Sequence, residues 1–279
     1  MECRDIFGSG IERETYFALR KKWAQEVDVF PLLPVRVVVG FDRVQAIQDK
    51  KEKCFLLKTE FDYVVCWKNR GIPMLVVEFD GIGCGFSRGV RYETIDSPRT
   101  VPNRRKKLEA KLRICAEAEI PAVVASTDEV RAIDAATHFT ILDGIIGEVL
   151  ASSIFTNAVE HQRFKSVDEV ENLEIELSLQ KNPINREISR LLATLLSVDP
   201  AAGRRAQKRL YDRQSEDFIG CNTTVRFGGQ EFAANIYIRD VNCQGFAAYG
   251  LAESLSELAA LKDAARSKGM ILLDELPFA

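Results

Sequence analysis

The sequence of 279 residues predicts a mixed α/β fold, with a first domain built on a central mixed sheet flanked by helices and a C-terminal α+β domain. Three observations predict it: an apolar hairpin that carries acids, a basic helix directly before a buried strand, and a strand–strand–helix pattern near the end. We place the domains at residues 1–160 and 161–279. The composition, 46% hydrophobic and 28% charged, is that of an ordinary globular protein with enough apolar residues for a core.

The first domain begins with an amphipathic helix over residues 10–26, for which Ser9 is a suitable N-terminal cap. The run 27–40 is apolar and β-branched, but Pro31 and Pro34 interrupt it, which favours a short edge strand. The acidic hairpin follows. The expected elements after it are a Gly- and Pro-rich loop over 82–103, a helix over 103–119, a buried strand over 120–125 and helices over 128–157.

The C-terminal domain is expected to open with helices over residues 166–213, broken at Asn182-Pro183 and Asp199-Pro200. The remaining expected elements are strands over 220–246, a helix over 251–268 and a last strand over 270–273. We assign this domain to binding or to dimerisation, so a homodimer is one of the expected assemblies.

The hairpin brings acidic residues onto one side of an otherwise apolar sheet. Two apolar runs flank the turn-forming sequence Lys68-Asn69-Arg70-Gly71, and a register centred on this turn places Asp62 opposite Glu78. Asp80 shares the face of Glu78 because side chains alternate along a strand. Like charges opposite each other destabilise a sheet, so the simplest compensation is a bound divalent cation.

Charge and cysteine content exclude several classes of protein. The net charge of −3 means that any nucleic-acid surface must be a local patch. The seven cysteines are odd in number and widely spread, which favours free thiols in a reducing, cytoplasmic location. They include no CxxC pair, which argues against a structural zinc site. His138 and His161 are the histidines of the chain, too few for a His-rich metal site. Neither a signal core nor an apolar run of membrane-spanning length is found, so no membrane partner is expected.

The order of these features resembles the PD-(D/E)XK restriction-endonuclease-like superfamily, in particular its very-short-patch-repair-like and domain-of-unknown-function branch, over about residues 8–126. An acid on a first helix, an Asp on one strand, Glu-x-Asp-Gly on the next and a basic helix before an Ile-Pro strand carry the resemblance. Glu12, Asp62 and Glu78 match the acids, and Lys111 matches a helix lysine of relatives. The resemblance implies a restriction-endonuclease-like core and metal-dependent hydrolysis of phosphodiester bonds in nucleic acid.

The sequence departs from the family pattern at two positions. Most members of the superfamily have a lysine two residues after the second acid, whereas this chain has Asp80. Some relatives share this Glu-x-Asp arrangement. Cys84 stands where those relatives tend to place a histidine. The missing histidine leaves two interpretations, an altered chemistry or an inactive binding domain.

The residue types suit phosphodiester hydrolysis. Mg²⁺ or Mn²⁺ takes oxygen ligands, so we expect Asp62, Glu78 and Asp80 to hold the ion, together with the Phe79 carbonyl. Lys111 is expected to orient the attacking water or to stabilise the transition state. The predicted catalytic residues are Asp62, Glu78, Lys111 and Glu12.

A local concentration of positive charge follows the acids. Residues 88–113 contain nine Lys or Arg and three Asp or Glu. Phosphate backbones bind largely by charge neutralisation, so nucleic acid is the expected partner, with DNA favoured over RNA. The predicted nucleic-acid contacts are Arg104, Arg105, Lys106 and Lys107. A second basic cluster over 204–213 is interpreted as an accessory nucleic-acid surface or as an ordinary exposed face.

Each assignment has a structural alternative. Glu12 can stabilise the dipole of its helix, Lys111 can be a solvated helix residue, and Asp80 can begin a turn at Gly81. Three functions therefore stay open: a nuclease, a non-catalytic nucleic-acid-binding protein on a nuclease-like fold, or a protein-interaction protein whose acids are structural.

Overall fold

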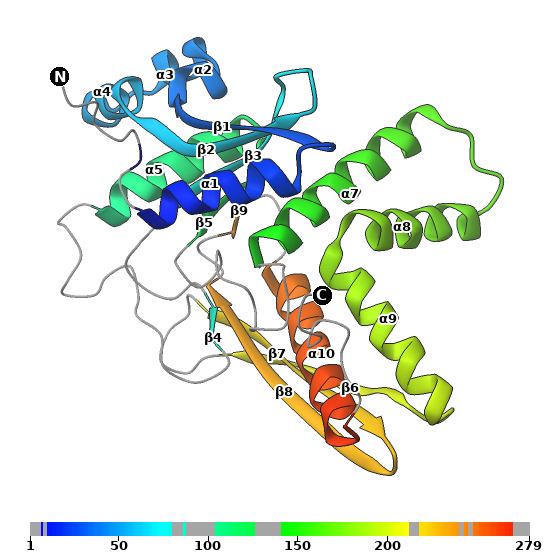
Figure 1. Cartoon of the computed structure of the whole chain (residues 1–279). Helices are drawn as coiled ribbons and strands as arrows, with labels where there is room; N and C mark the ends of the chain where they lie inside the picture. The colour runs from blue at the N-terminus through cyan, green and yellow to red at the C-terminus, as the bar shows by residue number, and fades with distance from the viewer. Residues whose placement is uncertain are drawn as a thin grey trace. The chain divides into compact units, whose positions relative to one another are not determined.

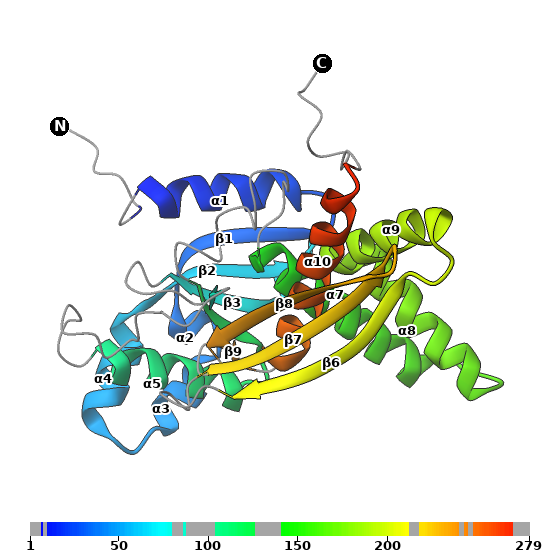
Figure 2. The ribbon, with the colours of Figure 1, turned by 90° about the horizontal axis from the view of Figure 1, so that it is seen from below.

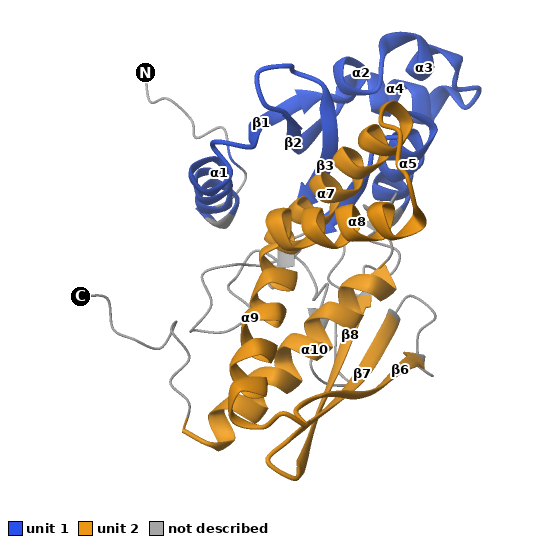
Figure 3. Cartoon of the chain, turned by 90° about the vertical axis from the view of Figure 1, so that its right-hand side faces the viewer, with its two compact units in different colours: residues 1–84, 93–130, 242–246 blue, residues 85–92, 131–241, 247–279 orange. Residues whose placement is uncertain are grey.

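The computed structural model describes residues 7, 10–79, 86–87, 104–125, 141–211, 218–239, 243–244 and 248–269 (Figure 1). The chain divides into two compact units, each with its own sheet (Figure 3). Unit 1 comprises Met1–Cys84, Glu93–Val130 and Asn242–Phe246, and unit 2 comprises Gly85–Tyr92, Arg131–Val241 and Ala247–Ala279. The units interleave along the chain, whereas the sequence analysis placed a single boundary after residue 160.

Unit 1 has a five-stranded mixed sheet with helices on both faces. Its elements are α1 (Gly10–Lys22), β1 (Val27–Pro34), α2 (Val35–Val38), α3 (Phe41–Ala46), α4 (Lys50–Lys58), β2 (Glu60–Trp67), β3 (Pro73–Phe79), α5 (Arg104–Glu117), β5 (Ala122–Ala125) and β9 (Cys243–Gln244). The strand order is β1-β2-β3-β5-β9, in which β3 and β5 are parallel and the other neighbours antiparallel. Figure 2 shows α1 and α5 on opposite sides of this sheet. The expected α/β domain, with a mixed sheet between helices, is confirmed.

The predicted turn between β2 and β3 is confirmed, and β1 holds it in place. Asn69 and Gly71 have positive φ angles of 59° and 64°, which Asn and Gly adopt more readily than other residues. Asp28 of β1 accepts hydrogen bonds from Lys68 Nζ and from the Asn69 N–H, each at 2.7 Å. The turn is therefore fixed both by its own sequence and by a carboxylate of the neighbouring strand.

The register of the hairpin decides which face each acid takes. Tyr63 pairs with Val77 across β2 and β3, and the same register places Asp62 opposite Glu78, as the sequence predicted. Because side chains alternate along a strand, Asp62 and Glu78 share the face that packs against α4 and α5. Tyr63 belongs to the other face, on the side of α1 (Figure 2).

Three short helices between β1 and β2 were not expected from the sequence. The strand predicted within 27–40 ends at Pro34, and α2 begins at the next residue. The Asp49 carboxylate caps α4 by accepting from the backbone N–H groups of Lys51 and Glu52 at 2.7 and 3.0 Å. The three helices close one side of the unit 1 core, to which α2, α3 and α4 each contribute buried residues.

Unit 2 has a four-stranded antiparallel sheet and, among its described residues, four long helices. Its elements are β4 (Phe86–Ser87), α7 (Ile141–His161), α8 (Val167–Lys181), α9 (Pro183–Val198), β6 (Gly203–Tyr211), β7 (Phe218–Phe227), β8 (Gln230–Arg239) and α10 (Ala248–Ser267). The strand order is β4-β8-β7-β6, and α10 packs on β7 and β8. The succession β7–β8–α10 is the strand–strand–helix pattern that the sequence predicted.

The prediction of helix over residues 166–213 is correct as far as Val198 and wrong beyond it. The predicted breaks at residues 182–183 and 199–200 are present, but Gly203–Tyr211 forms β6, which pairs with β7 at the edge of the sheet. This segment lacks apolar alternation, and its strand conformation comes from pairing with β7 rather than from local propensity. The exposed basic side chains of β6 are Arg204, Arg205, Lys208 and Arg209. The second basic cluster therefore lies on a sheet edge instead of a helix.

Three expectations fall largely outside the described residues. The loop predicted over 82–103 is described only where β4 forms, and the strand predicted over 270–273 is not described. Of the helices predicted over 128–157, the structure describes the part from residue 141, which belongs to α7.

α7 is long, apolar and closely packed within unit 2. By length and composition, its stretch Leu142–His161, with a mean hydropathy of 1.2, is the one described helix that could cross a membrane, so the expectation that no apolar run reaches membrane-spanning length is wrong. Half of this stretch is buried in the structure. Gly147 of α7 lies against the connection between α8 and α9. A β-carbon at this position would come 2.6 Å from the Lys181 carbonyl oxygen and 2.7 Å from Asn182 Cα. The two segments can approach this closely because residue 147 has no side chain.

We expect Gly147→Ala to lower the free energy of unfolding by about 1–3 kcal/mol, because the added methyl group would meet main-chain atoms that cannot rotate away. Urea unfolding followed by circular dichroism measures the change. Gly250→Ala in α10 is the matched control: nothing lies within 4 Å of a β-carbon there, so the change should stabilise the helix by about 0.5–1 kcal/mol. Equal effects of the two substitutions would contradict the close approach at Gly147.

Candidate active site

The candidate site is formed by three elements of unit 1 that meet on one face of the sheet. β2 carries Asp62, β3 carries Glu78, and α5 carries Lys111. α5 packs against the sheet through buried residues that flank Lys111 on both sides, Ala110 and Leu112. Lys111 is therefore directed into the protein, with 8% of its surface exposed, and Glu78 is 4% exposed.

Lys111 binds both strands of the hairpin. Its Nζ donates to Glu78 Oε2 at 2.6 Å and to the backbone carbonyl of Glu60 at 2.6 Å. The ammonium also lies 5.8 Å from the ring centroid of Phe61, a distance at which a cation is attracted to an aromatic face. The alternative that Lys111 is a solvated helix residue is therefore wrong, because its charge is buried against Glu78.

Asp62 binds the end of β3. Its Oδ2 accepts a hydrogen bond from the backbone N–H of Phe79 at 2.6 Å. This bond fixes the main chain directly after Glu78, so the two predicted acids are tied together through backbone as well as by strand pairing. Asp62 thus has a positioning contact that the sequence analysis did not identify.

Burial changes the acid–base properties of Glu78. Removal from water raises its pKa to about 8; the charge of Lys111 opposes this rise, and the negative charge of Asp62 adds to it. Burial also raises the pKa of the Cys115 thiol to about 12, and the charge of Glu78 contributes to that rise. Cys115 follows Lys111 by one helical turn, and its buried thiol is neutral.

The second oxygen of Glu78 makes no hydrogen bond to the part of the chain that the structure describes. Glu78 Oε1 is buried and, among the described residues, has no hydrogen-bond donor. A buried, unpartnered carboxylate oxygen beside a second carboxylate is the kind of donor set that Mg²⁺ or Mn²⁺ takes, with waters completing the shell. Asp62 and Glu78 therefore fit a divalent cation. No group of three or more His, Cys, Asp or Glu side chains suited to a metal occurs among the described residues, so a third protein ligand would have to be a backbone carbonyl or lie outside them.

Glu12 is linked to the sheet from the side of α1. The Tyr63 hydroxyl donates to the Glu12 backbone carbonyl at 2.7 Å. Burial raises the pKa of Tyr63, and the charges of Glu12 and Asp62 contribute to the rise. The link places Glu12 near β2, on the helix that covers the face opposite α5 (Figure 2).

The other predicted site residues are described only in part. Asp80 and Cys84 lie outside the described residues, and so do the side chains of Arg104 and Arg105, whose backbone begins α5. Lys106 and Lys107 are exposed. Lys107 Nζ lies 5.7 Å from the ring centroid of Phe55 in α4, so this predicted nucleic-acid contact is beside an aromatic side chain.

Several participants were missed in the sequence. The Glu60 carbonyl, the Phe61 ring and the Cys115 thiol all line the Lys111–Glu78 pair. Cys115 could have been found, because it lies four residues after Lys111 on the same face of a helix. A backbone carbonyl carries no sequence signal, so the contact between Lys111 and the Glu60 carbonyl could not have been predicted.

Comparison of the chain with protein-family models, curated proteins and solved structures gave no match.

The raised pKa of Glu78 predicts how stability depends on pH. The folded protein keeps the Glu78 proton up to about pH 8, whereas the unfolded chain releases it near pH 4.5. The free energy of unfolding should therefore fall as pH rises from about 5 to about 8, with Glu78 contributing up to about 1.4 kcal/mol per pH unit. Glu78→Gln should remove this contribution, as measured by urea unfolding in EDTA across that range.

Glu60→Gln is the matched control, because its exposed side chain lies on the same strand and the substitution leaves its carbonyl in place. Added Mg²⁺ at pH 8 should stabilise the wild type and the control more than Glu78→Gln. If the pH profile of Glu78→Gln runs parallel to that of the wild type, Glu78 is already ionised in the folded protein, and the argument from burial is wrong.

Proposed function

We propose that this protein is a metal-dependent nuclease that hydrolyses phosphodiester bonds of nucleic acid. The observation that carries the proposal is the buried contact between Lys111 and Glu78, next to Asp62, with Glu78 Oε1 unpartnered within the described parts of the chain. A lysine and paired carboxylates with a strongly shifted pKa are typical of a catalytic site. A purely structural ion pair would be expected to satisfy both oxygens of its carboxylate.

The order of the elements supports a restriction-endonuclease-like core for unit 1. The features of the resemblance fall in turn on α1, β2, β3, α5 and β5. Asp62 and Glu78 lie on neighbouring central strands, and the helix lysine reaches the second acid. This arrangement supports the proposed resemblance.

A divalent cation held by Asp62 and Glu78, when bound, would polarise the scissile phosphate and lower the pKa of a water. The protein's own side chains would position the substrate and neutralise the charge on its phosphate. Lys111 has three N–H donors, of which Glu78 and Glu60 accept two, so the third can reach a phosphate oxygen as negative charge builds there. Asp62, fixed by the Phe79 N–H, keeps its carboxylate beside Glu78.

The predicted substrate is nucleic acid, with DNA favoured. Lys106 and Lys107 precede Lys111 on α5 and are exposed. A phosphate chain bound by these cations would lead along the helix toward the acids. The support for nucleic acid is therefore the position of the basic residues on the helix that also carries the site lysine.

A second candidate function is nucleic-acid binding without catalysis. The burial of the Lys111–Glu78 pair favours it, since the two side chains are 10% and 5% exposed and a substrate needs access. Cys84, at the position where relatives with a Glu-x-Asp arrangement tend to have a histidine, agrees with this candidate. Cleavage and binding assays on the same protein separate the two functions.

Asp62→Asn and Glu78→Gln should each abolish cleavage dependent on Mg²⁺ or Mn²⁺, with rates falling at least about a hundredfold, because each removes a charged ligand. The measurement is incubation of purified protein with fluorescent DNA and RNA of mixed sequence, resolved on denaturing gels. Asp42→Asn, a change of an exposed acid on α3, is the matched control and should cleave normally. Unaltered cleavage by Asp62→Asn and Glu78→Gln would place the activity elsewhere, and wild-type protein that binds but never cleaves would establish the second candidate.

Lys111→Ala should reduce the cleavage rate far more than the affinity for nucleic acid, because its proposed contact forms with charge that develops in the transition state. The rate under single-turnover conditions and the affinity in EDTA provide the two readouts. Equal losses in both would show that Lys111 only holds the fold or the substrate. The far-ultraviolet circular dichroism of the variant must match the wild type for the comparison to count.

A further inference from the structure

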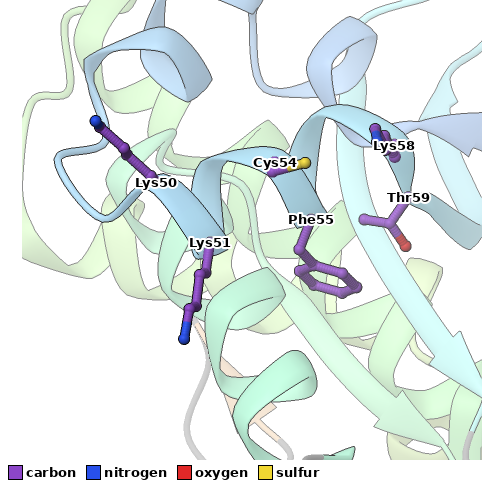
Figure 4. A pocket seen from close by; sticks show the side chains of 6 residues that line it. All are labelled: Lys50, Lys51, Cys54, Phe55, Lys58 and Thr59. Atoms are coloured by element: carbon purple, nitrogen blue, oxygen red, sulfur yellow. The ribbon is translucent and has the colours of Figure 1, made fainter.

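A hollow in unit 1 is lined by lysines and lies one helix away from the acids. It has a volume of about 560 Å³ and is lined by Lys50, Lys51, Cys54, Phe55, Lys58 and Thr59 (Figure 4). The side chains of Lys51, Phe55 and Thr59 point to the same side of the chain, because they follow one another at intervals of four residues. The surface there combines an aromatic ring with cations.

The lining of this hollow carries an excess of positive charge. Among the described residues, Lys50, Lys51 and Lys58 have no side-chain ion pair, and none of the lining residues is acidic. Asp49, which caps α4, attracts Lys51 and offsets part of its charge, whereas Glu52 pairs with Arg113 of α5. The remaining positive charge favours an anionic ligand.

The hollow is connected to the candidate active site through α5 and β2. Thr59 directly precedes Glu60, whose carbonyl accepts from Lys111. On α5, Lys107 lies one turn before Lys111 and approaches the Phe55 ring to 5.7 Å. A chain of phosphates that passes from the acids along α5 would reach Lys107 first and the lysines of the hollow next.

We propose that this hollow binds a single-stranded segment of nucleic acid next to the cleavage position, with Lys51 and Lys58 on its phosphates and a base against Phe55. Proteins that hold single strands combine a positive groove with aromatic rings on which unpaired bases stack. The choice of nucleic acid over other polyanions rests on the proposed function. The geometry and charge of the hollow do not depend on catalysis.

Binding is measured by fluorescence anisotropy with a labelled single-stranded oligonucleotide in EDTA, where no metal-dependent cleavage interferes. Lys51→Ser with Lys58→Ser should weaken binding and lower the slope of log affinity against log salt by about 1.4, since each lost phosphate contact accounts for about 0.7. Phe55→Leu should weaken binding by roughly five- to a hundredfold with an unchanged salt slope, because it removes stacking without removing charge. The matched control is Arg163→Ser with Lys165→Ser, exposed cations of unit 2 outside the hollow.

Cys54 provides a second readout, which is independent of the anisotropy measurement. Its thiol is exposed, whereas those of Cys66 and Cys115 are buried. Bound oligonucleotide should slow alkylation of Cys54 by N-ethylmaleimide, followed by mass spectrometry of its peptide, and the double lysine variant should lose this protection at the same oligonucleotide concentration. Inorganic phosphate should give little protection.

Three results would overturn the inference: an unchanged affinity and salt slope in the double lysine variant, unprotected Cys54 in protein saturated with oligonucleotide, or equal protection by inorganic phosphate. Each is distinct from failure of the proposed function. Protein that never cleaves but shows the lysine-dependent salt slope supports the hollow and refutes the nuclease. Protein that cleaves DNA but binds it independently of Lys51 and Lys58 supports the nuclease function and refutes binding in the hollow.

Discussion

The contact between Lys111 and Glu78 is the interaction on which unit 1 depends most. It joins α5 to β3 directly and to β2 through the Glu60 carbonyl, so one ammonium links α5 to both strands of the hairpin, at sequence separations of 33 and 51 residues. A buried pair of this kind contributes little net stability, but loss of one partner typically costs about 3–5 kcal/mol. The pair therefore acts mainly as a constraint on how α5 can pack. Any displacement of the helix along the sheet would separate Lys111 Nζ from Glu78 Oε2 and from the Glu60 carbonyl.

The parts of this arrangement that follow from neighbouring residues could be predicted. The turn at Asn69 and Gly71, the alternation of side chains and the opposition of Asp62 and Glu78 all depend on a single hairpin, whose geometry is set by its own turn. The inward direction of Lys111 could not be obtained in this way. The periodicity of α5 does not distinguish a lysine that faces solvent from one that faces the sheet, and only the packing of the helix on β2 and β3 shows that Lys111 is buried together with Ala110, Leu112 and Cys115.

The elements that sequence patterns missed depend on distant partners. β6 is basic and has no apolar alternation, and it is a strand because β7 supplies its hydrogen bonds. The helices between β1 and β2 are too short for a periodic pattern to identify, and their packing comes from the core that they share with α5. The division into interleaved units was missed for the same reason. It depends on the pairing of β9 with β5, which joins residues more than a hundred positions apart.

This last pairing has a consequence for how the chain acquires its structure during synthesis. The ribosome releases α1 to β5 first, then most of unit 2, and only afterwards β9, which covers the outer edge of β5. Until then β5 presents unpaired backbone groups at the edge of a nearly complete sheet, a position at which other strands can add. The nascent protein has to keep this edge from self-association while about a hundred further residues are made. A chaperone that protects exposed edges, or rapid folding of unit 2, would shorten that interval, and a fragment that ends before β9 would carry the exposed edge permanently.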